Sequence, residues 1–199
     1  MTDDNAHDGI RAPLVLSVAL LVGVFASLVT APAAEGLYGA FLAALMLAIA
    51  ANDARYYLIP NELSGAAFAL ALLRGATAVP DAGAVALLWP LVRAVAVALP
   101  LLLLMLAYRR WRGRDGLGLG DVKLAAVCGA WLELTTVVAV IELAALSAIA
   151  AYAVNAGLRR KPLRATAFLP FGLFLAPAIW IGWAAEALLA QSWLADWLD

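Results

Sequence analysis

The sequence predicts an all-α membrane protein, a polytopic bundle with six to seven transmembrane helices. Of its 199 residues, 66% are hydrophobic and only 14% are charged, and the mean hydropathy of +0.95 lies far above that of soluble domains. A spanning helix uses roughly 20 apolar residues, so little of the chain is left for an aqueous domain. We therefore expect one membrane-embedded domain over residues 13–190, a cytoplasmic tail over 1–12 and a short external tail over 191–199.

Charged residues, glycines and prolines divide the chain into seven apolar runs, each a candidate span. The fifth run is too short to cross a bilayer alone, so residues 122–155 form either two tightly connected helices or one long, bent helix. The expected spans are 13–30, 37–52, 63–79, 85–108, 122–132, 134–155 and 167–190.

The distribution of basic residues favours two separate helices for the fifth and sixth runs. With seven spans, both arginine-rich loops fall on one side of the membrane, whereas the opposite turns hold no basic residue apart from Arg74. Cytoplasmic loops are enriched in Lys and Arg, so we predict a cytoplasmic N-terminus and an external C-terminus. The two loops contain Arg109, Arg110, Arg112 and Arg114, and Arg159, Arg160, Lys161 and Arg164.

Composition excludes several other classes of protein. The formal net charge is -1, so there is no general positive field to attract nucleic acid. One cysteine, Cys128, and one histidine, His7, provide neither a disulfide nor a His/Cys zinc site. We expect no metal and no cofactor. The acidic start of the chain also differs from a cleaved signal peptide, so we expect the first run to be a retained span.

A few ionisable side chains lie in or near the expected spans. A charge at the bilayer centre costs about 2.5–3.5 kcal/mol on insertion scales, so each one needs a partner, water or a function. We expect Arg93 to snorkel outward or to pair with Glu142, and the arginine-rich loops to contact anionic membrane lipids. These side chains are Asp53, Arg93, Asp121, Lys123, Glu142 and Glu186.

Two of the acids stand in distinctive segments. Asp53 ends the second run and is followed by a turn at Ile59-Pro60-Asn61, because proline cannot donate a backbone hydrogen bond. Asp121 follows alternating glycines and opens the fifth run. Asp53 is either a solvated charge at the membrane surface or a functional group, and Asp121 is either the N-cap of a helix or a functional group.

With seven spans, Asp53 and Asp121 both reach the cytoplasmic boundary of the membrane. Two carboxyl groups about 3 Å apart share one proton, so one of them activates a water as general base while the other donates to a carbonyl oxygen. That chemistry is aspartyl proteolysis.

Three blocks in this order resemble the type IV prepilin peptidase and preflagellin peptidase family, membrane aspartyl proteases with a GxGD signature. They are Asp53 with Ile59-Pro60-Asn61, then Gly118-Leu119-Gly120-Asp121-Val122-Lys123, and then Pro170-Phe171-Gly172. The resemblance implies that Asp53 and Asp121 are catalytic. It implies supporting or substrate-lining roles for Pro60, Asn61, Gly118, Gly120, Lys123, Pro170, Phe171 and Gly172.

The chain looks like the short, peptidase-only branch of the tight-adherence (Flp-type) pilus systems. Long members carry a cytoplasmic segment after the first span, often with CxxC pairs, where this chain has only a turn at 31–36. The resemblance implies a bacterial inner-membrane enzyme that cleaves the leader of prepilin-like substrates without N-methyltransferase activity. It leaves the oligomeric state and the identity of the prepilin open.

The main alternative is a small proton- or ion-coupled transporter whose path is lined by intramembrane carboxylates. Transporters place charges near the midplane and show two similar halves, and no such repeat is evident. A presenilin-like GxGD protease is a nearer alternative, but it gives no reason for the Ile-Pro-Asn and Pro-Phe-Gly blocks.

Overall fold

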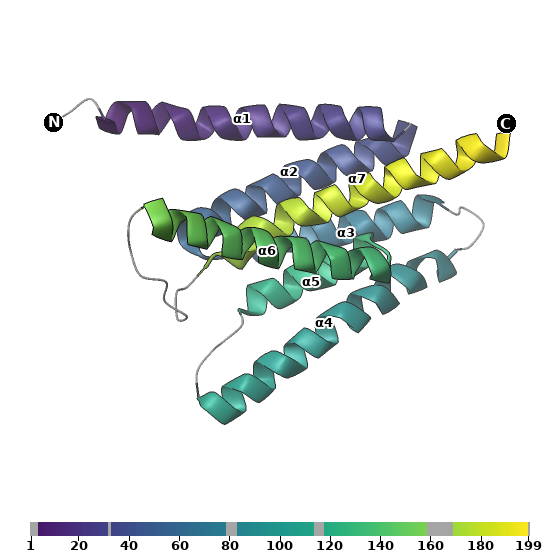
Figure 1. Cartoon of the computed structure of the whole chain (residues 1–199). Helices are drawn as coiled ribbons and strands as arrows, with labels where there is room; N and C mark the ends of the chain where they lie inside the picture. Colours follow the sequence, from purple (N-terminus) through teal and green to yellow (C-terminus); the bar gives the residue numbers. More distant parts are fainter. Residues whose placement is uncertain (1–3, 32, 79–82, 114–117, 159–168, 199) are drawn as a thin grey trace.

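The structure is a computed structural model that describes residues 4–31, 33–78, 83–113, 118–158 and 169–198, with side chains between 14 and 192. These residues form seven α-helices and no strand. The helices alternate in direction (Figure 1), so α1 starts and α7 finishes at opposite ends of the bundle. They are α1 (Asp4–Thr30), α2 (Ala33–Tyr56), α3 (Asn61–Ala78), α4 (Val85–Arg112), α5 (Leu119–Trp131), α6 (Leu134–Leu158) and α7 (Phe171–Leu198).

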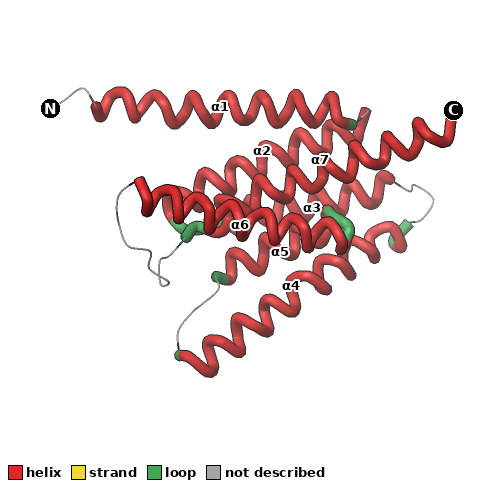
Figure 2. The backbone as a smooth tube through the Cα atoms, in the orientation of Figure 1, coloured by secondary structure: helices red, strands yellow, loops and turns green. Residues whose placement is uncertain are grey.

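The fifth and sixth runs are separate helices, as the charge distribution predicted. Leu132 is extended, with φ −113° and ψ 157°, and its N–H donates to the carbonyl of Cys128, which ends α5. The N–H of Val137 donates to the carbonyl of Glu133, which starts α6. Figure 2 shows the short loop between the two helices.

Most helices extend beyond the apolar runs from which they were predicted. α1 begins at Asp4 rather than near residue 13, and α7 continues to Leu198. The backbone hydrogen bonds of a helix do not depend on apolar side chains, so a helix continues into polar sequence. α7 begins at Phe171, directly after Pro170, because proline disfavours the helical conformation in the residue before it. Of the predicted run 167–190, residues 167 and 168 lie outside the described part.

Four of the described helices are long and apolar enough to cross a membrane: α2, α4, α6 and α7 up to Ser192. α5 has only 13 residues and is therefore about 20 Å long. The apolar layer of a bilayer is about 30 Å thick. An upright α5 therefore cannot reach both surfaces, and at least one of its ends lies within the layer.

The core forms around α2 and α7, which run side by side through the middle of the bundle (Figure 1). α1 packs on α2, α6 packs on α7, and α4 packs on α5. The fully buried Trp183 of α7 lies against Gly39 of α2, where a β-carbon would come within 1.8 Å of the indole ring. The absence of a side chain at Gly39 thus sets how closely the two central helices approach.

We predict that Gly39→Ala destabilises the bundle. A methyl group has no room beside the Trp183 ring, and overpacking of this kind costs about 1–3 kcal/mol. A thermal unfolding scan in detergent measures the change. Gly65→Ala on α3 is the matched control, because its β-carbon meets nothing within 4 Å, and we expect a gain of about 0.5–1 kcal/mol there. Equal melting temperatures for the two variants would contradict this account.

Candidate active site

Asp53 lies in the last turn of α2 and is 5% exposed. The carbonyl of Asp53 accepts a hydrogen bond from the N–H of Tyr57 at 2.9 Å, and Tyr57 takes a left-handed conformation with φ 54°, which ends the helix. Asn52 Nδ2 donates to the carbonyl of Leu58 at 2.8 Å and fixes the following loop. The chain therefore reverses directly after Asp53.

Pro60 and Asn61 connect this loop to α3. The carbonyl of Pro60 accepts hydrogen bonds from the N–H of Ser64 at 3.2 Å and from Ser64 Oγ at 3.1 Å. Asn61 is the first residue of α3, and its Oδ1 accepts a hydrogen bond from Lys123 Nζ of α5 at 2.5 Å. The bond between Asn61 and Lys123 thus joins the start of α3 to α5.

Asp121 is the third residue of α5 and not its N-cap. Gly118 occupies the N-cap position, because it keeps an extended conformation (φ −75°, ψ 144°) and the helix starts at Leu119. Asp121 Oδ2 accepts a hydrogen bond from the Gly118 N–H at 3.3 Å. This satisfies one of the amide groups left free at a helix start, and it orients the carboxyl group.

The start of α7 meets the carboxyl group of Asp53. The N–H of Leu173 donates to Asp53 Oδ2 at 2.9 Å. At Gly172, which is buried, a β-carbon would lie 2.9 Å from the same oxygen. Pro170 and Phe171 are half-buried beside it. Glycine is therefore required at position 172 for the helix to approach the aspartate.

Ile59 connects the three predicted blocks. It is buried between α5 and α7: a β-carbon at Gly120 would lie 3.2 Å from Ile59 Cβ, and one at Gly172 would lie 2.9 Å from Ile59 Cδ1. Asp53 Oδ2 lies 2.9 Å from the same β-carbon position at Gly172, and Asp121 directly follows Gly120 in the chain. Two acids that are 68 positions apart in the sequence are thus brought together at one end of the bundle.

Sequence reasoning placed Ile59 in a turn and in the first block of the resemblance but gave it no role at the site, and it did not identify the Leu173 backbone as a partner of Asp53. The sequence signal that could have indicated a packing role for Ile59 is its position, as an apolar residue directly before Pro60. No sequence signal marks the Leu173 amide, because every residue except proline carries one.

The other ionisable groups are arranged differently from the prediction. Arg93 forms an ion pair with Glu133 rather than with Glu142. The reason is packing: α4 lies against α5, and Glu133 follows α5 directly. Glu142 is exposed on α6, and Glu186 accepts a hydrogen bond from the N–H of Glu133 at 2.8 Å. Glu133 and Glu186 thus lie near the end of α5, whereas Asp121 lies at its start.

Some predictions cannot be placed in the fold. Arg109, Arg110 and Arg112 lie in the last turn of α4. The remaining basic loop residues, Arg114, Arg159, Arg160, Lys161 and Arg164, lie outside the described residues. Within the described part, no group of three or more His, Cys, Asp and Glu side chains is arranged to hold a metal ion.

Comparison with known proteins gives a consistent result. Residues 40–154 match the type IV leader peptidase family. A prepilin leader peptidase/N-methyltransferase of Pectobacterium carotovorum subsp. carotovorum is 32% identical over 168 residues, which are 82% of this chain and 58% of the relative. The corresponding protein of Klebsiella pneumoniae is 37% identical over 124 residues, which are 61% of this chain and 52% of the relative.

A leader peptidase of Escherichia coli, HopD, is 43% identical over 84 residues, or 42% of this chain and 52% of the relative. The chain spans about half the length of the curated relatives it matches. No solved structure matches it significantly. The family match covers more than half of the chain and includes both Asp53 and Asp121. This integral membrane helix bundle therefore belongs to the type IV leader peptidase family, a family of peptidases.

Proposed function

We propose that this protein is a membrane aspartyl endopeptidase that removes the leader peptide of prepilin-like substrates, with Asp53 and Asp121 as the catalytic dyad. The observation that carries the proposal is the meeting of the three blocks around Ile59, which brings both carboxyl groups to one end of the bundle. Each carboxyl group is also held by a backbone N–H, from Leu173 and from Gly118.

The reaction needs one proton shared between the two acids. The ionised carboxylate takes a proton from a water molecule, and the resulting hydroxide adds to the carbonyl carbon of the peptide bond. The protonated partner donates to the carbonyl oxygen. The tetrahedral intermediate then breaks its C–N bond, the proton removed from the water passes to the leaving amine, and one hydroxyl group of the intermediate returns its proton to the carboxylate that had donated it. Backbone hydrogen bonds to both carboxyl groups support this scheme because they fix the orientation of the acids before substrate binds.

The surroundings of the dyad suit a substrate that is partly in the membrane. α5 is shorter than the apolar layer is thick, so Asp121 at its start can lie below the membrane surface. Arg109, Arg110 and Arg112 at the end of α4 and Arg55 at the end of α2 lie at the same end of the bundle as the dyad (Figure 1). The positive-inside rule supports a cytoplasmic position for that end, in an inner membrane.

The resemblance to prepilin peptidases implies the form of the proposed substrate, and this placement suits it. A short basic leader stays in the cytoplasm, a small residue precedes the cleaved bond, and an apolar helix begins directly after it and lies in the bilayer. We further propose an Flp-type prepilin as the natural substrate, as in the short branch that the sequence resembles.

We predict that Asp53→Asn and Asp121→Asn each abolish leader cleavage. Loss of a positioned acid or base lowers a rate by about 10²–10⁴-fold, which takes processing below detection in a gel-shift assay with a coexpressed prepilin. Glu142→Gln is the matched control, since Glu142 is an exposed carboxyl group on α6, and it should cleave at the normal rate. Full activity in either aspartate variant would rule out the dyad.

We predict that Gly172→Ala reduces cleavage while the protein still folds. The added methyl group pushes against Asp53 Oδ2 and Ile59 Cδ1, and a displacement of about 1 Å at a reacting group costs about 10²-fold in rate. Initial rates on a prepilin peptide in detergent measure the effect. Gly157→Ala is the control, because its β-carbon meets nothing within 4 Å. A Gly172→Ala variant as active as the control would mean that the α7 approach does not set the geometry of Asp53.

We predict that the new N-terminus of the processed substrate carries no methyl group. α1 ends at Thr30 and α2 begins at Ala33, so no cytoplasmic segment separates the first two helices as it does in long members of the resembled family. Mass spectrometry of the processed substrate after incubation with S-adenosylmethionine measures this directly. A mass increase of one methyl group that depends on this protein would contradict the prediction.

A further inference from the structure

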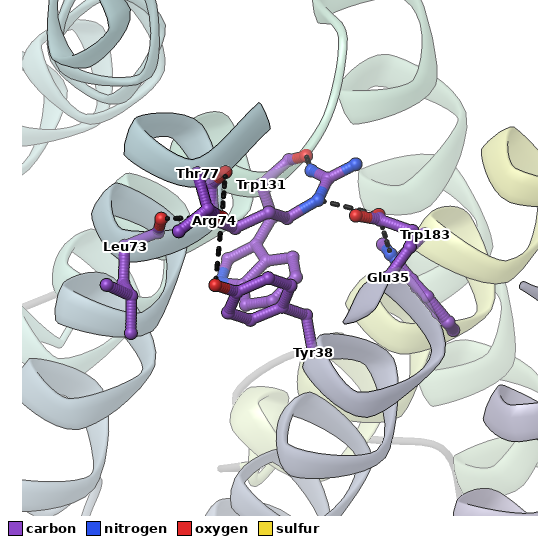
Figure 3. A network of polar contacts seen from close by, with 7 residues as sticks. All are labelled: Glu35, Tyr38, Leu73, Arg74, Thr77, Trp131 and Trp183. Carbon is purple, nitrogen blue, oxygen red and sulfur yellow. Dashed lines mark hydrogen bonds and ion pairs between the residues drawn. The ribbon is translucent and has the colours of Figure 1, made fainter. Parts of the chain in front are cut away.

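A cluster of polar side chains lies at the end of the bundle opposite the dyad. Figure 3 shows it, and we call it the distal polar cluster. Glu35 stands in the first turn of α2 and Asp53 in the last, so the two are about 27 Å apart along the helix. The side chains that form the cluster are Glu35, Tyr38, Arg74, Thr77, Trp131 and Trp183.

Arg74 of α3 is the centre of the cluster. Its Nε donates to Glu35 Oε1 of α2 at 2.7 Å, and its Nη1 donates to the carbonyl of Trp131, the last residue of α5, at 3.1 Å. The guanidinium group also lies 5.4 Å from the centroid of the Trp131 ring. One side chain thus holds the ends of three helices. The side chains of Arg74 and Glu35 are 27% and 35% exposed, so both are half-buried.

Indole and hydroxyl groups complete the cluster. Trp183 Nε1 of α7 donates to the same Glu35 oxygen at 3.1 Å. Trp131 Nε1 donates to the carbonyl of Ala67 on α3 at 2.9 Å. The hydroxyl groups of Tyr38 and Thr77 share a hydrogen bond of 2.9 Å between α2 and α3. The helices joined at this end are therefore α2, α3, α5 and α7.

These are the same four helices that carry the proposed site. α2 provides Asp53, α3 provides Asn61, α5 provides Asp121 and Lys123, and α7 provides the Leu173 amide. We propose that Arg74 is a positioning residue for the dyad: the distal polar cluster fixes how far the four helices are shifted along one another, and thereby the separation of Asp53 and Asp121. This inference rests on the proposed function of the dyad.

The physical reason is the stiffness of α-helices. Moving a helix by one residue along its axis moves its other end by about 1.5 Å, and about 1 Å of misplacement in an active site is enough to cost about 10²-fold in rate. The hydrophobic attraction around α2 and α7 has no preferred direction, whereas the hydrogen bonds of Arg74 have preferred lengths and angles and therefore favour one axial register.

The chain also supplies a matched control. Arg93 of α4 forms an ion pair with Glu133 in the half of the bundle that holds the distal polar cluster. This second pair attaches α4, which carries neither aspartate, to the turn between α5 and α6. Arg74→Met and Arg93→Met remove the same chemical group, and only the first removes a bond among the four site helices.

The experiment measures kcat and KM of the full chain in detergent. The probe is a synthetic peptide with a basic leader, a small residue before the cleaved bond and an apolar helix. We expect Arg74→Met to lower kcat about 10- to 100-fold with KM within about twofold, and Arg93→Met to leave kcat unchanged. Arg74→Lys keeps the charge but replaces the guanidinium fork with a single ammonium nitrogen, and we expect its kcat between those of wild type and Arg74→Met. Equal kcat in Arg74→Met and Arg93→Met would overturn the proposal.

The pH profile of kcat separates positioning from stability. Two coupled carboxyl groups titrate in two apparent steps whose spacing depends on their separation. We therefore expect the spacing to change in Arg74→Met and to stay constant in Arg93→Met. A constant spacing in both would overturn the proposal, even if Arg74→Met lowers the melting temperature. If Arg74→Met does not fold, the same two measurements on Arg74→Lys decide, and a wild-type kcat with a wild-type profile overturns it.

Failure of this inference is distinguishable from failure of the proposed function. If Asp53→Asn and Asp121→Asn are inactive while both Arg74 variants retain normal kcat, the dyad stands and the positioning role falls. If either aspartate variant remains active, the dyad itself is wrong, and the positioning role falls with it.

Discussion

The N–H of Leu173 at the start of α7 donates to the buried carboxyl group of Asp53 at the end of α2, and this bond constrains that whole end of the bundle. A buried carboxyl group without a partner is costly, so α7 must begin where its free N-terminal amides reach the aspartate. Gly172 permits the approach, and Pro170 helps to place the start of the helix. The turn after Asp53 then positions Ile59 between Gly172 and Gly120, which places α5 and Asp121 beside it.

The bundle therefore has two ends with different requirements. At one end, glycines allow the backbone of α5 and α7 to approach one isoleucine and one aspartate. At the other end, Arg74 and Glu35 join the same helices through directed hydrogen bonds. A site built from two carboxyl groups depends on both ends of the bundle. The close approach at one end brings the acids together, and the bonds at the other end fix the axial positions of the helices and so hold the acids at one separation.

Much of the fold and of the site could be predicted. Apolar runs and basic loops predicted seven helices, with the fifth and sixth separate, and the structure shows seven among the residues it describes. Helix ends were predicted less well, since the backbone ladder continues past the apolar run, as at Asp4 and Leu198. The N-cap alternative for Asp121 and the Glu142 alternative for Arg93 were wrong, because a helix start depends on local φ and ψ and an ion pair on which helices pack together.

By itself, the sequence determined that the chain lies in a membrane. It also determined which few ionisable residues lie in or near the spans, because hydropathy and charge depend only on amino-acid composition and residue order. It also determined which three blocks carry the family signature. Only the tertiary structure decided that Ile59 joins those blocks, that a backbone amide of α7 holds Asp53, and that Arg74 connects α3 with the ends of α2 and α5. Those contacts join residues 39 to 120 positions apart, and chain order alone does not specify which helix faces pack together.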